Sequence, residues 1–177
     1  MSLGNAMVDI ETLGTHPGAV ILSIGAVRFD DGGVIEGTDF YRCIDVFSSL
    51  MAGLTIDRQT VEWWREQAPE ARGPLLNAQH TLSDALSDFG RWLEGEPRVW
   101  AKGPDFDLVL LQAAYNALGL QQPWAYRNAR DVRTLLSLVP PESIGTTWIK
   151  HHALDDAKAQ AEAVRGAYSR LGLRLTP

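Results

Sequence analysis

Met7-Val8-Asp9-Ile10-Glu11-Thr12-Leu13-Gly14 is the stretch that decides the interpretation of this chain. Residues two apart on a strand project from the same face, so Asp9 and Glu11 lie side by side while Val8 and Ile10 point the other way. Two neighbouring carboxylates either share a proton or hold a cation, and Mg²⁺ and Mn²⁺ take oxygen ligands of this kind. Alone, Asp-x-Glu is more often a solvated strand end, so the residues downstream decide.

The composition predicts one compact domain. A chain of 177 residues with 45% hydrophobic residues can build a single core, which we expect over residues 6–172, with residues 1–5 partly vector-derived. No apolar run is long enough for a bilayer and no signal peptide pattern opens the chain, so we expect a cytoplasmic protein without a membrane partner. The single cysteine, Cys43, excludes an internal disulfide and fits a buried strand position.

The charge balance limits the mode of nucleic-acid binding. A net charge of −6 argues against a broad phosphate-binding surface. An enzyme that handles only a strand end needs few cations, and Arg127, Arg130, Arg133 and Lys150 are candidates for contacts to one or two phosphates. Ordinary surface charge is the alternative interpretation of these residues.

The hydrophobic periodicity predicts an α/β fold, with a mixed central sheet flanked by helices. An antiparallel meander opens the chain and parallel strands follow, because strands come first and alternate with helices later. The expected strands cover residues 6–11, 19–27, 38–44 and 98–101. The expected helices cover residues 58–67, 82–94, 105–118, 131–138 and about 153–171.

A second acidic motif, Gly103-Pro104-Asp105-Phe106-Asp107-Leu108, lies where a strand ends and a helix begins. Sites in α/β sheets gather at such strand ends, so a carboxylate here can meet those of the first strand. Asp105 is well placed as the helix N-cap, whereas Asp107 follows a buried Phe106 and is harder to explain as a cap. We therefore favour Asp107 as the ligand.

A third motif, His151-His152-Ala153-Leu154-Asp155-Asp156-Ala157, opens the last helix. Asp155 falls on the charged face, where a first-turn acid complements the helix dipole. Asp156 falls on a shoulder beside Gln160 and Ala163, where small residues let the helix approach the sheet. Both histidines are available to take a proton near neutral pH.

The three motifs, in this order and spacing, resemble the DEDDh branch of the 3′–5′ exonucleases, whose fold is ribonuclease H-like. The resemblance extends from Met7 to about Leu171. It is closest to a bacterial and phage group of exoribonucleases and exodeoxyribonucleases, in which Trp63-Trp64, Pro123-Trp124 and Asp131-Val132-Arg133-Thr134 also have counterparts. Lys102 departs from that group, which often has Asn there; it alters local hydrogen bonding or adds a phosphate contact.

The resemblance implies a metal-dependent exonuclease that shortens single-stranded RNA or DNA from the 3′ end and releases nucleoside 5′-monophosphates, with RNA slightly favoured. It assigns two divalent cations, Mg²⁺ or Mn²⁺, to Asp9, Glu11, Asp107 and Asp156, and the role of general base to His151. Thr12 and Leu13 would meet the terminal sugar and base, or simply form a turn.

The adjacent tryptophans Trp63 and Trp64 cannot both face the core of one helix. We favour packing or a homodimer contact for the pair, and of the two Trp64 is the candidate to stack on an unpaired base. Two other functions remain open. One is a non-catalytic nucleic-acid-binding module, and the other is an iron oxygenase that uses His151, His152 and a carboxylate.

Overall fold

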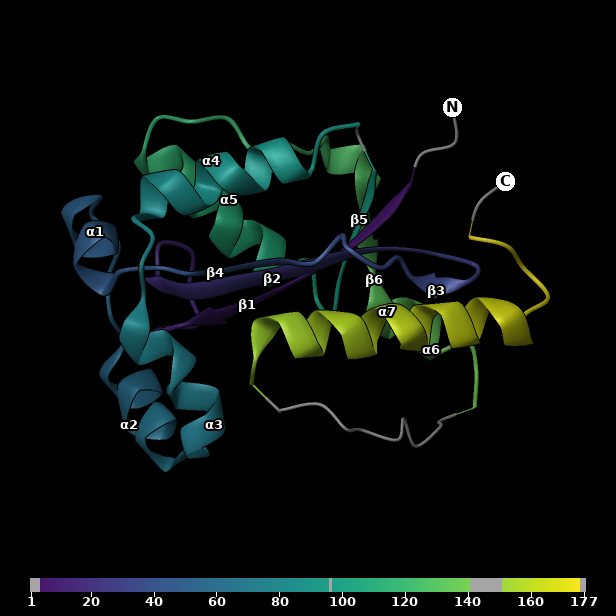
Figure 1. Cartoon of the computed structure of the whole chain (residues 1–177), viewed down its shortest axis with the longest axis horizontal. Coiled ribbons are helices and arrows are strands. Elements are labelled where there is room, and N and C mark those ends of the chain that lie inside the picture. Colours follow the sequence, from purple (N-terminus) through teal and green to yellow (C-terminus); the bar gives the residue numbers. More distant parts are fainter. Residues whose placement is uncertain (1–3, 96, 141–150, 176–177) are drawn as a thin grey trace.

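A mixed β-sheet with helices on both faces forms the centre of the molecule (Figure 1). The structure is a computed structural model that describes residues 4–95, 97–140 and 151–175. Within these residues the strand order is β3-β2-β1-β5-β6, and β4 also pairs with β2. The strands are β1 (Asn5–Thr12), β2 (Ile21–Asp30), β3 (Gly33–Val34), β4 (Phe40–Cys43), β5 (Arg98–Ala101) and β6 (Ala129–Asp131).

The helices fall into three groups in space. In Figure 1, α4 and α5 cover one face of the sheet, α6 and α7 cover the other, and α1 to α3 lie at one end. The α-helices are α1 (Val46–Met51), α2 (Arg58–Glu66), α3 (Pro69–Arg72), α4 (Leu82–Trp92), α5 (Asp107–Ala117), α6 (Val132–Leu136) and α7 (Ala153–Arg170). The 3₁₀ turns are η1 (Pro74–Asn77) and η2 (Tyr126–Asn128). Within the described residues, no helix is both long enough and apolar enough to cross a membrane.

The strand pairing confirms the predicted mixture of directions. β1 pairs antiparallel with β2, which pairs antiparallel with β4, so the chain opens as a meander. On its other side β1 pairs parallel with β5, and β5 pairs parallel with β6. The central position of β1 places its C-terminal end, where the acidic pair lies, among several other elements.

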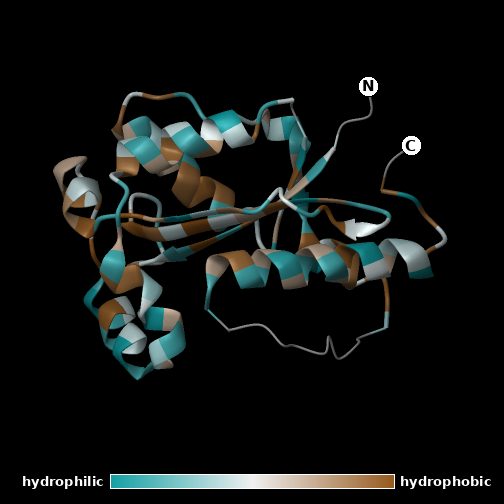
Figure 2. Ribbon diagram, viewed as in Figure 1, coloured by the Kyte–Doolittle hydropathy of each residue, from teal (hydrophilic) through white to brown (hydrophobic). Residues whose placement is uncertain are grey.

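Side-chain alternation along β1 separates two apolar cores. Val8 and Ile10 pack into the core beneath α4 and α5, whereas Met7 packs into the core beneath α7. Figure 2 shows apolar residues along the strands and α5, and alternating polar and apolar residues on α7. Asp9 and Glu11 share the face of Met7, so they point toward the first turn of α7.

Several predicted boundaries differ from the structure. The second strand begins at Ile21 rather than residue 19 and runs on to Asp30, because Ala19 instead bridges to Thr55. The helix predicted over 131–138 is shorter and starts at Val132, since Asp131 ends β6 and caps the helix with its carboxylate. The short elements β3, β6, α1 and α3 were not predicted, because two to six residues carry little periodicity.

The cysteine also differs slightly from the expectation. Cys43 does lie on a strand, β4, but it is half-buried rather than buried. An edge strand covers its side chains on fewer sides than a central one, which explains the remaining exposure.

Candidate active site

Four carboxylates from three distant segments converge at the end of β1. Asp9 and Glu11 come from β1, Asp107 from the first residue of α5, and Asp156 from the first turn of α7. The charge of each of the other three carboxylates raises the pKa of Asp9, and Asp156 and Asp107 do the same to Glu11. The structure thus brings together all four acidic residues that the sequence motifs selected.

A glycine on the neighbouring strand allows α7 to reach this site. Gly25 is the partner of Asp9 in the β1–β2 pairing, and a methyl group added to it would overlap the backbone of Ala153 and Leu154. The first turn of α7 therefore rests directly on the backbone of β2. The sequence predicted close approach from the small residues of the helix but did not single out Gly25, which no motif marks.

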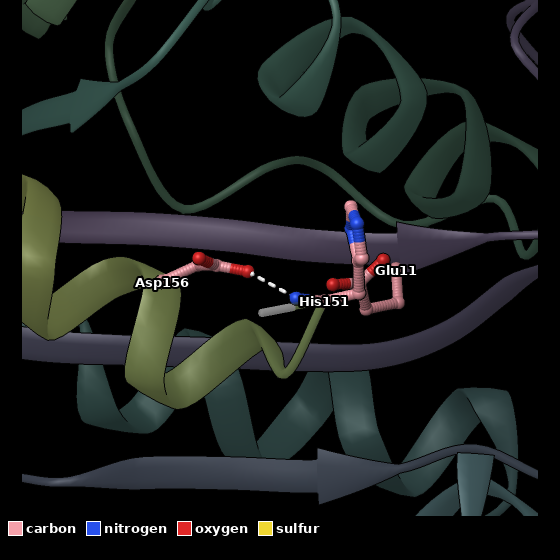
Figure 3. Close-up of side chains that lie close together, drawn as sticks. All are labelled: Glu11, His151 and Asp156. Atoms are coloured by element: carbon pink, nitrogen blue, oxygen red, sulfur yellow. Dashed lines mark hydrogen bonds between the residues drawn. The ribbon is translucent and has the colours of Figure 1, made fainter. Parts of the chain in front are cut away.

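His151 precedes α7 in a left-handed backbone conformation, with φ of 62°. This conformation is uncommon for a residue with a side chain, and such residues gather at functional sites. The His151 backbone N–H donates to Asp156 Oδ2 at 2.9 Å (Figure 3). One ring nitrogen of His151 and one carboxylate oxygen each of Glu11 and Asp156 all lie within 4.8 Å of one another.

The two candidate aspartates of the second motif have different surroundings. The buried Asp107 accepts a hydrogen bond from the backbone N–H of Ile10 at 3.3 Å, on the side of β1 that faces β5. Its neighbour Asp105 is exposed, and the prediction that it caps the helix is wrong. α5 begins two residues later than expected, at Asp107, and its N-cap position is occupied by Phe106 without a side-chain hydrogen bond.

Two polar residues of the α7 N-terminal region make supporting contacts, Gln160 to a carboxylate of the site and His152 to the helix terminus. Gln160, one turn after Asp156 on α7, donates from Nε2 to Asp9 Oδ1 at 2.7 Å. His152 caps α7, because its Nδ1 accepts from the backbone N–H of Asp155 at 3.4 Å, and its ring packs on Tyr41. His152 is therefore occupied at the helix terminus, which disfavours the iron site that required both histidines. Among the described residues, the metal-competent cluster contains His151 alone of the two.

Burial and mutual repulsion raise the pKa values of the four carboxyl groups. Burial, followed by the charges of Asp156 and Asp107, raises the pKa of Glu11 to about 8. Burial raises the pKa of Asp107 to about 7, against hydrogen bonds that lower it, and also raises the pKa values of Asp9 and Asp156. Carboxylates forced together in this way need protons or cations. An all-oxygen donor set fits hard divalent ions such as Mg²⁺ or Mn²⁺.

A cavity of about 470 Å³ opens beside Glu11, on the α2 side of the site. The residues that line it are Ile10, Glu11, Thr12, Thr15, Asp57, Gln59, Thr60, Trp63, Trp64 and Phe106. Thr12 thus lies in the cavity wall. Leu13 is partly buried outside it, and its backbone N–H and C=O bond to Val20 and Asp57.

The two tryptophans have exchanged their expected positions. Trp64 is only 6% exposed, and its Nε1–H donates to the Thr12 carbonyl at 2.8 Å. Trp63 is 41% exposed, and its ring meets the His151 ring edge-on with centroids 4.8 Å apart. The expectation that Trp64 offers the exposed ring is therefore corrected, because α2 turns that side chain toward the loop after β1 and leaves Trp63 at the cavity mouth.

Fold and site together define the class, a 3′–5′ exonuclease of the ribonuclease H-like fold, and comparison with known proteins confirms it. A model of the 3′-5′ exoribonuclease Rv2179c-like domain matches residues 4–167. The chain belongs to this family. The predicted relationship to DEDDh-type exonucleases and the predicted fold class are therefore correct.

Individual relatives are more distant. An exodeoxyribonuclease of enterobacteria phage T4 is 24% identical over 155 residues, which are 72% of this chain and 68% of the phage protein. E. coli exonuclease I solved with zinc and single-stranded DNA superimposes with a TM-score of 0.70 at 15% identity, over 97% of this chain. Its complex with a dA16 oligonucleotide gives 0.70 at 14% identity, over 96%. This chain spans 42% of the length of exonuclease I in each case.

Proposed function

We propose that this chain is a metal-dependent 3′–5′ exonuclease that removes nucleoside 5′-monophosphates one at a time from single-stranded nucleic acid. The observation that carries the proposal is the convergence of Asp9, Glu11, Asp107 and Asp156, with a histidine ring nitrogen beside them. A non-catalytic binding module has no need of all five groups.

The residues take separate roles in the proposed reaction. The four carboxylates would hold two divalent cations, Mg²⁺ or Mn²⁺, which when bound supply charge stabilisation for an in-line displacement at phosphorus. His151 takes a proton from the attacking water, because a neutral imidazole nitrogen can act as a general base. Asp156 fixes the His151 backbone through its hydrogen bond, and Gln160 orients Asp9.

The cavity between β1 and α2 suits the terminal nucleotide. It lies against Glu11, so a base held there places the adjoining phosphate at the carboxylates. Trp63 offers an aromatic surface at its mouth, which is compatible with any base. An unpaired 3′ end fits such a cavity better than a duplex, which supports a preference for single strands.

The family and the relatives suggest both polymers. The family model describes exoribonucleases, whereas the phage relative is an exodeoxyribonuclease. We propose a slight preference for RNA on the strength of the family, and a cytoplasmic enzyme that acts as a monomer or homodimer. Rates on matched RNA and DNA oligonucleotides test the preference, and sedimentation tests the assembly.

The decisive experiment follows a 5′-labelled single strand in Mg²⁺ or Mn²⁺. The expected result is a ladder that shortens from the 3′ end, disappears with EDTA, and is absent with Asp107→Asn. Asp105→Asn is the matched control, because it removes the same charge two residues away. Binding without cleavage by the wild-type protein would instead identify a non-catalytic module.

A further inference from the structure

Two cationic side chains, Lys102 and Arg133, lie beside the acidic site on the side away from α2. They can reduce the repulsion between this site and a polyanionic substrate. A chain of net charge −6 whose site gathers four carboxylates repels a nucleic-acid strand. The terminal nucleotide lies on the α2 side in the proposed function. On the side of the carboxylates away from α2, β5 ends and α6 begins, and this side is free to take the next phosphate along the strand.

Lys102 is the first residue after β5, in the bend that leads to Gly103. Met7 and Trp100 are partners in the parallel pairing of β1 with β5, and both pack into the core beneath α7. Asp9 lies two residues further along β1, and Lys102 lies two residues further along the chain from Trp100, one residue past the end of β5. Lys102 is exposed, it adjoins Gly103, whose carbonyl accepts the Asp107 N–H, and its charge offsets part of the rise that burial causes in the pKa of Asp156.

Arg133 reaches the same place from α6. Its guanidinium lies against Gly103, with Cζ 3.3 Å from the position that a Gly103 Cβ would take. The Gly103 carbonyl in turn accepts the backbone N–H of Asp107, and the charge of Arg133 offsets part of the rise that burial causes in the pKa of Asp107. A residue larger than glycine at 103 would displace the guanidinium from this position.

Both cations remain available to a ligand. Neither forms a salt bridge with another of the described residues, and both are exposed. Asp105 lies on the same glycine and partly offsets their charge. Lys150, the other cation that the sequence suggested near this site, lies outside the described residues.

We infer that Lys102 and Arg133 together bind the phosphate one nucleotide to the 5′ side of the scissile phosphate. This inference rests on the proposed function for the position of the terminal nucleotide. It defines the path of the substrate strand. The terminal nucleotide lies in the cavity, the scissile phosphate at the carboxylates, and the next phosphate at Lys102 and Arg133. It also implies that substrates with at least two phosphodiesters are preferred over those with one.

The test is a double-mutant cycle that combines a change in the protein with a change in the substrate. It measures binding, so cleavage is not required. Trinucleotides carry either two ordinary linkages or a neutral methylphosphonate at the linkage 5′ of the scissile one, and fluorescence anisotropy gives Kd in the Asp107→Asn background. Neutralising the linkage should weaken binding roughly 10-fold. Lys102→Met or Arg133→Met should weaken binding of the ordinary trinucleotide similarly, and of the methylphosphonate much less.

A salt titration separates a phosphate contact from a merely structural effect. For a single strand, each lost contact should reduce the slope of log K against log salt by roughly 0.7. Arg91→Met is the control, since Arg91 lies on α4, on the other face of the sheet, and removes the same charge. It should leave Kd and slope unchanged.

The outcomes are distinct. Additive effects of protein and linkage changes, or unchanged salt slopes, overturn the phosphate contact. Coupling in the cycle supports it even if the wild-type protein fails to cleave the trinucleotide in Mg²⁺, a failure that would count against the proposed function alone.

Discussion

Asp105 and Asp107 stand two residues apart and meet opposite surroundings. Asp107 is buried against the backbone of β1, where its carboxylate accepts from Ile10, and Asp105 is exposed. Asp155 and Asp156 differ in the same way, since Asp155 interacts with His152 while Asp156 joins the cluster with Glu11 and His151. The chemistry of an aspartate here is set by its position on the element and not by its motif.

Matched aspartate substitutions test that division. Asp107→Asn and Asp156→Asn should each reduce kcat/KM by more than the roughly 10–100-fold that loss of a residue supporting a metal ligand costs. Asp105→Asn and Asp155→Asn should retain most activity, because their carboxylates lie outside the cluster. Steady-state rates of all four variants on one oligonucleotide test this expectation. A larger loss for Asp105→Asn than for Asp107→Asn, or for Asp155→Asn than for Asp156→Asn, would show that the ligand assignment is wrong.

The tryptophan pair separates binding from stability. Trp63→Ala should weaken oligonucleotide binding by about 1–3 kcal/mol, the range for loss of a base-stacking aromatic, with little change in folding stability. Trp64→Ala should lower the free energy of unfolding by about 3–5 kcal/mol, because it empties a buried site and removes the bond to Thr12. Anisotropy and urea unfolding measure the two effects. Equal binding losses in both variants would contradict the exposed role of Trp63.

At the scale of elements, the docking of α7 on β2 assembles the site. Gly25 lets the helix backbone touch the strand, and the helix then carries His151, Asp156 and Gln160 to the carboxylates of β1. A shift of this helix would therefore move His151, Asp156 and Gln160 together.

Gly25→Ala tests this docking. The added methyl group overlaps the backbone at Ala153, so we expect a loss of about 1–3 kcal/mol in folding stability and a fall in kcat/KM of roughly 100-fold. Gly90→Ala on α4 is the control, because its nearest neighbours would lie 3.8 Å or more away and alanine favours a helix. Wild-type activity in Gly25→Ala would mean that the approach is not required.

The sequence could predict those elements whose period was long enough to read. The alternation through Asp9 and Glu11 and the shoulder position of Asp156 both follow from local geometry, and the structure agrees with them. The roles of Gly25 and Trp63 could not be predicted, because each depends on which distant segment packs against it. The short strand β6 was not predicted for the same reason, because it forms through its pairing with β5, which is a tertiary contact.

Across the whole molecule, excess negative charge is concentrated at one buried place. The folded state raises the pKa of Glu11 from an ordinary 4.5 to about 8 and that of Asp107 from 3.8 to about 7. A carboxyl whose pKa is raised on folding holds its proton better in the folded protein. Its stabilising contribution is therefore complete below about pH 4 and is lost as the pH rises through 7 to 8.

Metal-free protein should accordingly lose stability between pH 5 and pH 8, by up to several kcal/mol, since one pKa unit corresponds to about 1.4 kcal/mol. Urea unfolding in EDTA at the two pH values measures the loss. Glu11→Gln should flatten the dependence, and Mg²⁺ at pH 8 should restore stability by binding the folded state. Stability that rises toward pH 8 without metal and is insensitive to Glu11→Gln would contradict the repulsion.

The order of the ligands along the chain has a consequence for the nascent protein. β1 supplies Asp9 and Glu11, whereas His151 and Asp156 come from residues translated after every strand that the structure describes. A growing chain that ends before α7 has every described strand but lacks Asp156, so its site is incomplete. We therefore expect a nascent chain of the proposed exonuclease to be inactive until α7 has left the ribosome.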